Sequence, residues 1–136
     1  MGQNMAYQDE VQLYSCLQDL FRQVETDMPQ ATDSLLKARL CIRLNVSVPT
    51  ATLLINAKER PLQIEYGRTN SHKPDLDIDV TGDALHQILL GQLSLTKAIG
   101  SKKVKPKGPV WKATALADLF YHAQKIYPAI ATAQNI

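Results

Sequence analysis

Hydrophobic and polar residues change their period several times along the chain. Apolar residues recur at three- and four-residue steps over residues 8–26, and this spacing predicts an amphipathic helix; a second, short helix is expected at 31–38. From residue 40 the period becomes two, so that apolar side chains alternate with polar ones in "LCIRLNVSV" (40–48). Such alternation predicts a strand with one face buried and the other in water.

Three further strands are expected, of which the last two alternate in the same way, and a short lysine-rich segment follows them later in the chain. The expected strands after the first are 52–57, 62–66, 75–81 and 102–107. Pro106 lies in the last of these segments and cannot donate a ladder hydrogen bond, so that strand is expected at an edge of the sheet or at a bulge.

Helical spacing returns at 83–91 and 95–99, where Asp83 and Ser94 are the expected N-caps. A last helix is expected from Pro109, because proline suits the first helical position.

The order of these elements predicts an α+β fold with a five-stranded, mainly antiparallel sheet and helices covering one of its faces. The chain has 136 residues, of which 45% are hydrophobic and 21% charged, values that fit one domain with its own core. The domain is expected to span residues 1–136, with the packed part at about 8–127. The tail, 128–136, shows no clear pattern and is expected to be flexible.

Three aspartates, Asp75, Asp77 and Asp79, alternate with apolar residues in the strand at 75–81. They share one face of that strand, where neighbours stand ~6.5–7 Å apart at about 3.3 Å per residue. One metal ion needs its oxygen ligands at roughly 2.3–2.6 Å, which a flat strand does not allow. The pattern therefore predicts a solvated sheet face, with the aspartates paired to lysines or arginines of a neighbouring strand, and no metal site.

Cysteine use and the chain's hydropathy indicate the compartment. Cys16 and Cys41 lack the spacing of a zinc site or a disulfide framework, so both are expected to be small buried hydrophobes in a reducing environment. The first ten residues lack the regions of a signal peptide, and no apolar run approaches the ~18–20 residues of a membrane span. We expect a cytoplasmic protein.

Motifs for catalysis or cofactor binding are not found in the sequence. There is no G-x-S-x-G elbow and no glycine-rich phosphate loop, and the histidines stand in no metal-ligand spacing. His86 is a candidate general base, but no acid or nucleophile accompanies it in the sequence. The chain is therefore expected not to be an enzyme and to use no cofactor.

One concentrated charge feature is a basic run made of Lys102, Lys103, Lys105 and Lys107. As an edge strand it needs no function, because lysines deter pairing with another edge. The alternative is contact with an anionic membrane surface, worth ~1 kcal/mol per basic residue. Nucleic acid is not expected, because the net charge is only 15 − 13 = +2 and few aromatic side chains are available for stacking on bases.

The segment "DLDIDVTGDALHQILLGQLSLTKAIGSKKVKPKGPVWKATALADLF" resembles the C-terminal half of the sterol carrier protein two family. The match consists of an alternating strand, a short helix with a "G-x-L" exit, an Ala before a Gly, a lysine-rich strand closed by Gly, and an apolar helix. The matching positions are Asp83, Leu85, Leu89, Gly91, Leu93, Ala98, Gly100, Val104, Gly108, Leu116, Leu119 and Phe120. The resemblance covers roughly residues 8–122 and is specific at 75–120.

This resemblance implies a lipid held in an apolar tunnel between the sheet and the helices. The residues expected to contact the ligand are Leu85, Ile88, Leu89, Leu93, Ile99, Leu116, Leu119 and Phe120. Such a site needs apolar surface and few polar anchors, since each lipid methylene removed from water yields ~0.8 kcal/mol. It therefore leaves no catalytic signature. Ordinary core packing is the alternative role for each of these residues.

Two functions follow from the resemblance. The first is non-catalytic binding or transfer of an apolar lipid of sterol, fatty acyl or isoprenoid type. The alternative is an interaction or dimerisation module of the same fold, which acts as an accessory to an enzyme of lipid or isoprenoid metabolism. A homodimer is compatible with both.

Overall fold

The computed structural model describes residues 6–59, 62–67 and 73–136. Its α-helices are α1 (Glu10–Asp27), α2 (Asp33–Ala38), α3 (Gly82–Leu89), α4 (Leu95–Gly100), α5 (Thr114–Ala123) and α6 (Tyr127–Ala133), and its short 3-10 helices are η1 (Pro29–Thr32) and η2 (Val110–Ala113). Its strands are β1 (Cys41–Ser47), β2 (Ala51–Asn56), β3 (Gln63–Tyr66), β4 (Leu76–Thr81) and β5 (Val104–Lys107). The expected order of elements is confirmed as far as α5.

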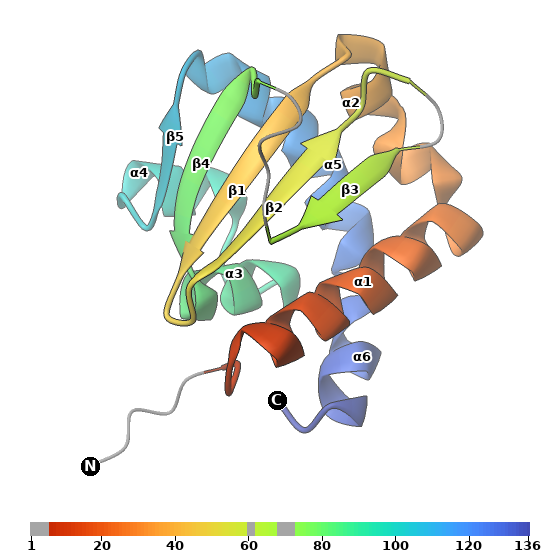
Figure 1. Ribbon diagram of the computed structural model, residues 1–136, viewed down its shortest axis with the longest axis vertical. Coiled ribbons are helices and arrows are strands. Elements are labelled where there is room, and N and C mark those ends of the chain that lie inside the picture. Colours follow the sequence, from red (N-terminus) through yellow and green to blue (C-terminus); the bar gives the residue numbers. More distant parts are fainter. Residues whose placement is uncertain (1–5, 60–61, 68–72) are drawn as a thin grey trace.

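The five strands form one open sheet in the order β3-β2-β1-β4-β5. β1, β2 and β3 make an antiparallel meander, after which the chain returns to place β4 parallel to β1 on its other side. β5 then adds to the far edge of β4 in the antiparallel sense. Figure 1 shows this sheet on the near side with α5 crossing behind it. The fold is therefore α+β with a mainly antiparallel sheet, as predicted.

The period-two pattern assigns each strand residue to one face of the sheet. Leu44 of β1 stands opposite Leu53 of β2 and Ile78 of β4, and all three are at most 5% exposed. Arg43, the residue of β1 before Leu44, is opposite Asp77 on the other face. We call the first face the inner face, because the helices cover it, and the second the outer face.

Two helix starts were predicted from cap residues, and one prediction was wrong. Ser94 caps α4 as expected, since its Oγ accepts a hydrogen bond from the backbone N–H of Lys97 (3.1 Å). The N-cap of α3 is Thr81, not Asp83; the Thr81 Oγ accepts from the N–H of Ala84 (3.1 Å). Asp83 lies inside the first turn and instead accepts a bond from the N–H of Ala6 (2.9 Å).

The end of the chain departs most from expectation. Residues 128–136 were expected to be a flexible tail, but Tyr127–Ala133 form α6, with Tyr127, Ile130 and Ala131 buried. Pro128 does not break this helix, because it occupies the first turn, where proline's missing N–H costs nothing. The side chain of Gln12 on α1 also donates to the backbone carbonyl of Gln134 (3.2 Å), which attaches the end of the chain to α1.

Two valines that belong to the apolar patterns of 8–26 and 40–48, Val11 and Val48, lie on the surface. Val11 is 69% exposed because the buried side of α1 passes through Leu13, Cys16 and Leu17 instead. Val48 is 51% exposed because β1 ends at Ser47 and Val48 belongs to the following turn, where its φ is 50°.

Candidate functional site: the apolar space between sheet and helices

The space between the inner face and the helices is lined by aliphatic and aromatic side chains. α3 contributes Leu85 and Leu89, and α5 contributes Leu116, Leu119 and Phe120, all of them at most 8% exposed. Each helix repeats these residues at three- and four-residue steps, so that one stripe meets the strands. Large side chains from two segments far apart in the sequence thus share one apolar layer.

Two small cavities lie within this layer. The first is bordered by α1, α3, α5 and strands β1 and β2; the second lies nearer β4, β5 and the start of α4. Leu44, Leu85, Leu116 and Phe120 border both of them. All the side chains around either cavity are apolar.

Each cavity has a volume of about 10 Å³. That is room for about one water molecule, whereas small-molecule sites usually measure roughly 300–1,000 Å³. A lipid chain can therefore enter these cavities only if the surrounding side chains change rotamer or α3 and α5 move apart from the sheet. The structure has the apolar walls that the resemblance implies, in a closed arrangement.

Six of the eight residues expected to contact a ligand border at least one of the cavities. They are Leu85, Ile88, Leu89, Leu116, Leu119 and Phe120. The other two, Leu93 and Ile99, are half-buried and pack against the core without bordering either cavity. This placement brings the six residues together around the two cavities.

Sequence reasoning missed the wall residues outside α3 and α5. α1 contributes Leu17, Leu20 and Phe21 to the first cavity, and Leu95 and Val104 border the second. The apolar stripe of α1 was visible in the sequence, but a stripe alone does not tell which buried residues adjoin a cavity.

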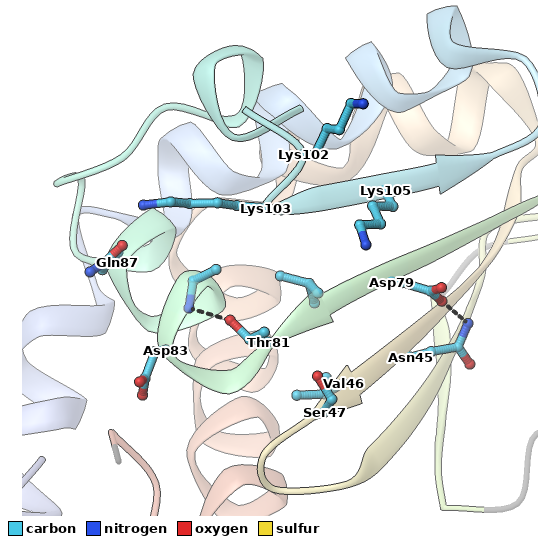
Figure 2. A pocket seen from close by; sticks show the side chains of 12 residues that line it. Asn45, Val46, Ser47, Asp79, Thr81, Asp83, Gln87, Lys102, Lys103 and Lys105 are labelled. Carbon is cyan, nitrogen blue, oxygen red and sulfur yellow. Dashed lines mark hydrogen bonds between the residues drawn. The ribbon is translucent and has the colours of Figure 1, made fainter. Parts of the chain in front are cut away.

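A separate, open groove of about 650 Å³ lies at the end of the sheet where β1 and β4 finish. Its sides come from the last residues of those strands, from the first turns of α3, and from the chain leading into β5. Figure 2 shows Lys105 pointing into this groove and Lys103 extending toward Gln87. Val80 borders both the groove and the second apolar cavity, so the two spaces are neighbours.

On the outer face, the three aspartates of the β4 region pair with basic side chains. Arg43 donates to both carboxylate oxygens of Asp77 (2.7 and 2.8 Å). Asp79 is 3.0 Å from the Nζ of Lys107, and Asp75 is 2.8 Å from that of Lys58. The predicted pairing with a neighbouring strand is therefore confirmed for Asp77 and Asp79, whose partners lie on β1 and β5. The partner of Asp75, Lys58, follows β2, which does not adjoin β4. The hydrogen bonds from Arg43, opposed by partial burial, hold the pKa of the Asp77 carboxyl below its usual range.

No potential metal site was found in the part of the chain that the structure describes, where no three His, Cys, Asp or Glu residues converge as ligands. The two cysteines are free and buried, as expected. Within the same residues, no helix is long and apolar enough to cross a bilayer.

A polar chain next to the apolar layer was not anticipated from the sequence. The hydroxyls of Tyr7 and Tyr127 lie 2.5 Å apart, and that of Tyr127 is 2.7 Å from Nδ1 of His86 on α3. Both tyrosines are fully buried. Burial lowers the pKa of His86, although the charge of Asp83 acts in the opposite direction. A neutral imidazole and the two hydroxyls can form this chain in either direction, because each group can donate or accept, so all three groups are paired.

Comparisons with known proteins agree with this architecture. Residues 17–121 match the model of the SCP-2 sterol transfer family. A search of curated protein sequences found no match.

Solved structures share the fold at low sequence identity. Sterol carrier protein domain 2 of Helicoverpa armigera is 23% identical with a TM-score of 0.65, and the match covers 91% of this chain and 94% of that one. Apo sterol carrier protein 2 of Yarrowia lipolytica is also 23% identical, with a TM-score of 0.61 and coverage of 78% and 88%. A ubiquinone synthesis protein, UbiJ-SCP2, is 16% identical, with a TM-score of 0.53 and coverage of 79% and 87%. From the family match, the five-stranded sheet and the apolar layer beneath it, we conclude that this chain belongs to the SCP-2 sterol transfer family.

Proposed function

We propose that the protein binds an apolar lipid, without catalysis, between the inner face of the sheet and helices α3 and α5. The observation that carries the proposal is the convergence of Leu85, Leu116 and Phe120 on both cavities of a wholly apolar layer. Family membership supports the same class of function. Sterols, fatty acyl chains and isoprenoids all fit this description, since each is recognised mainly by apolar surface.

The closed state of the layer is compatible with lipid uptake. Its walls are mostly leucine and other flexible side chains that can change rotamer. Each methylene of a bound chain contributes ~0.8 kcal/mol by leaving water. A chain of a dozen carbons can therefore offset a few kcal/mol of side-chain rearrangement, which is the size of the penalty for overpacking a core.

The experiment uses protein that has been delipidated, together with two variants that each add one indole. Leu89→Trp places the indole in the apolar layer, whereas Val11→Trp places it on the exposed side of α1. Titration with a fluorescent fatty acid should show binding to the wild type and to Val11→Trp, and at least tenfold weaker binding to Leu89→Trp. Mass spectrometry of lipid extracted from denatured, undelipidated protein identifies any natural ligand.

Urea denaturation of the same variants separates a ligand site from an ordinary core. Overpacking a filled core costs roughly 1–3 kcal/mol, so a large loss of stability in a protein that never binds the probe indicates a core only. Equal binding by Leu89→Trp and the wild type would place the ligand elsewhere.

The alternative function is an interaction module that assists a lipid- or isoprenoid-metabolising enzyme, alone or as a homodimer. The small volume of the two cavities favours it, because a packed layer needs no ligand. The ubiquinone synthesis protein among the structural neighbours shares the fold with this chain. If wild-type protein neither binds the probe nor carries extractable lipid, this function replaces the carrier.

We also propose transient contact of the lysine run with an anionic membrane surface. Lys107 pairs with Asp79, but Lys102, Lys103 and Lys105 are exposed and form no ion pair with any residue that the structure describes. Co-flotation with vesicles that contain anionic lipid, lost in neutral vesicles or at high salt, is the expected result.

A further inference from the structure

The open groove at the end of β1 and β4 contains positive charge that is not neutralised there. Lys103 and Lys105 border the groove and form no ion pair with any described residue. Figure 2 shows the Nζ of Lys105 directed into the groove between β5 and β4, and Lys103 reaching along its other side toward Gln87. Two ammonium groups, with three donors each, therefore face the same hollow from neighbouring positions.

The two acidic residues at the groove are engaged elsewhere. Asp79 is 3.0 Å from Nζ of Lys107 and accepts a bond from the side-chain amide of Asn45 (3.1 Å). Asp83 accepts the N–H of Ala6, and Figure 2 shows its carboxylate pointing away from the lysines. The groove is thus electropositive where Lys103 and Lys105 lie.

The groove and the apolar layer meet at the start of β5. Val104 stands between the two lysines, and its side chain points to the other side of the strand, where it borders the second apolar cavity. Val80, opposite Val104 in the register, borders both spaces. The two charges and the apolar interior therefore lie on opposite sides of β5, and a lipid can join them only around the start of this strand, where Val80 borders both spaces.

We propose that this groove binds the anionic head, carboxylate or phosphate, of a lipid whose chain occupies the apolar layer, with Lys103 and Lys105 as the binding residues. This inference rests on the proposed function and makes it more specific, because it selects anionic amphiphiles over neutral lipids of the same length. Gln87 supplies a neutral donor at the same groove.

The test compares two probes with the same chain, dodecanoate and dodecanol, at a pH at which the acid is ionised. Wild-type protein should bind dodecanoate about 25-fold more tightly than dodecanol, since each of the two lysines near an anionic head contributes on the order of a fivefold gain. In Lys103→Gln/Lys105→Gln this preference should disappear, chiefly through weaker binding of dodecanoate. High salt should reduce the preference in the wild type, because both lysines are exposed.

Lys37→Gln/Lys97→Gln is the matched control, since it removes the same net charge at exposed positions that do not border the groove. It should retain the preference for dodecanoate. If the control loses the preference to the same extent, the effect is one of net charge and the inference is wrong.

The remaining outcomes separate this inference from the proposed function. Equal affinity of the wild type for dodecanoate and dodecanol overturns the head-group site and leaves lipid binding intact. Binding of neither probe overturns the proposed function, and the inference with it.

Two further experiments distinguish a lipid head group from a free anion and from a membrane surface. Inorganic phosphate, titrated alone, should shift the amide resonances of Lys103 and Lys105 weakly or not at all; strong binding would make the groove a site for free anions and overturn the inference. Vesicle binding that depends on the two lysines, without any preference for dodecanoate, would overturn it in favour of a membrane contact only.

Discussion

The two faces of the central sheet are built from the same strands but held together by different forces. On the inner face of β4, Leu76, Ile78 and Val80 are at most 4% exposed and meet the helices through apolar contact alone. On the outer face, Asp77 and its neighbours make directional, charge-assisted bonds to basic side chains. Apolar contact has no fixed geometry, so the side chains of the inner layer can change rotamer without breaking directional bonds. The outer face cannot rearrange without losing specific bonds.

This difference assigns separate roles to the two faces. Arg43 of β1 bridges to Asp77 at the opposing register position of β4, and this bond fixes how the two parallel strands align. A shift of β4 by one residue along β1 would also turn Ile78 to the outer face. The contacts on both faces therefore oppose such a shift. The outer face thus helps to hold the sheet in shape if α3 and α5 shift to admit a ligand.

The largest expected effect comes from deleting a side chain of the inner layer. Leu85→Ala removes a residue that borders both cavities and is 2% exposed. Core truncations of this kind cost roughly 2–5 kcal/mol, because the lost contacts leave a larger void. Urea denaturation should show this loss, whereas Val11→Ala, at an exposed position, should stay within about 0.5 kcal/mol of wild type. A loss below 1 kcal/mol for Leu85→Ala would mean that the layer is already loosely packed.

A smaller effect is expected from the outer face. Asp77→Ala removes the acceptor of both Arg43 bonds and of one from Asn45 (3.0 Å). The pair is partly exposed, so we expect a loss of about 1–2 kcal/mol, less than for the inner layer. Asp19→Ala, which breaks the more exposed pair with Arg22, should cost about 0.5 kcal/mol or less. If Asp77→Ala destabilised more than Leu85→Ala, the comparison of the two faces would be reversed.

The same aspartate predicts how stability changes in acid. Because hydrogen bonds from Arg43 lower the pKa of Asp77 below its ordinary 3.8, the folded state binds this proton less readily than the unfolded state. Its contribution is therefore complete above pH 3.8 and is lost as the pH falls through the lower, folded pKa. The slope of unfolding free energy against pH should be shallower in Asp77→Asn below pH 4. An unchanged slope would show that Asp77 is not coupled to folding.

The smallest expected effect on stability comes from the titration of His86, which lies beside the apolar layer. Its ring contacts Tyr7 and Tyr127, and the charge of Asp83 acts on it. Since burial lowers its pKa below the ordinary 6.5, the neutral form is favoured in the folded state, and stability should decline as the pH falls below 6.5. His86→Asn keeps a side-chain acceptor for Tyr127 but cannot titrate, so this decline should be reduced. If the unfolding free energy of His86→Asn falls with pH as steeply as that of the wild type, another group causes the decline.

The sequence predicted those features that depend on local period and failed where distant segments meet. Alternation in "LDIDVT" was enough to place Ile78 inside and Asp77 outside, because each side chain's face follows from its strand position. α6 was missed because residues 128–136 show no clear pattern by themselves; the helical spacing of Tyr127, Ile130 and Ala131 begins one residue before them. The bond between Tyr7 and Tyr127 joins residues 120 positions apart, which no local pattern encodes.

The candidate site shows the same division between what local sequence patterns predict and what depends on packing. The leucines of α3 and α5 could be named because they form stripes that match the family pattern. The volume of the space between them depends on how every rotamer packs, and it proved to be about 10 Å³ in each cavity. The position of the groove next to Val104 depends on the pairing of β4 with β5, which the sequence did not specify.

Methyl NMR spectra recorded during a dodecanoate titration test the central claim most directly. Leu89 and Leu116 lie in the apolar layer, while Leu54 is fully buried on the outer face and serves as an internal control. We predict that the methyl resonances of Leu89 and Leu116 shift in a saturable manner, while those of Leu54 stay in place. Shifts at Leu54 of equal size, or saturable binding without any shift at Leu89 and Leu116, would contradict a ligand between the sheet and the helices.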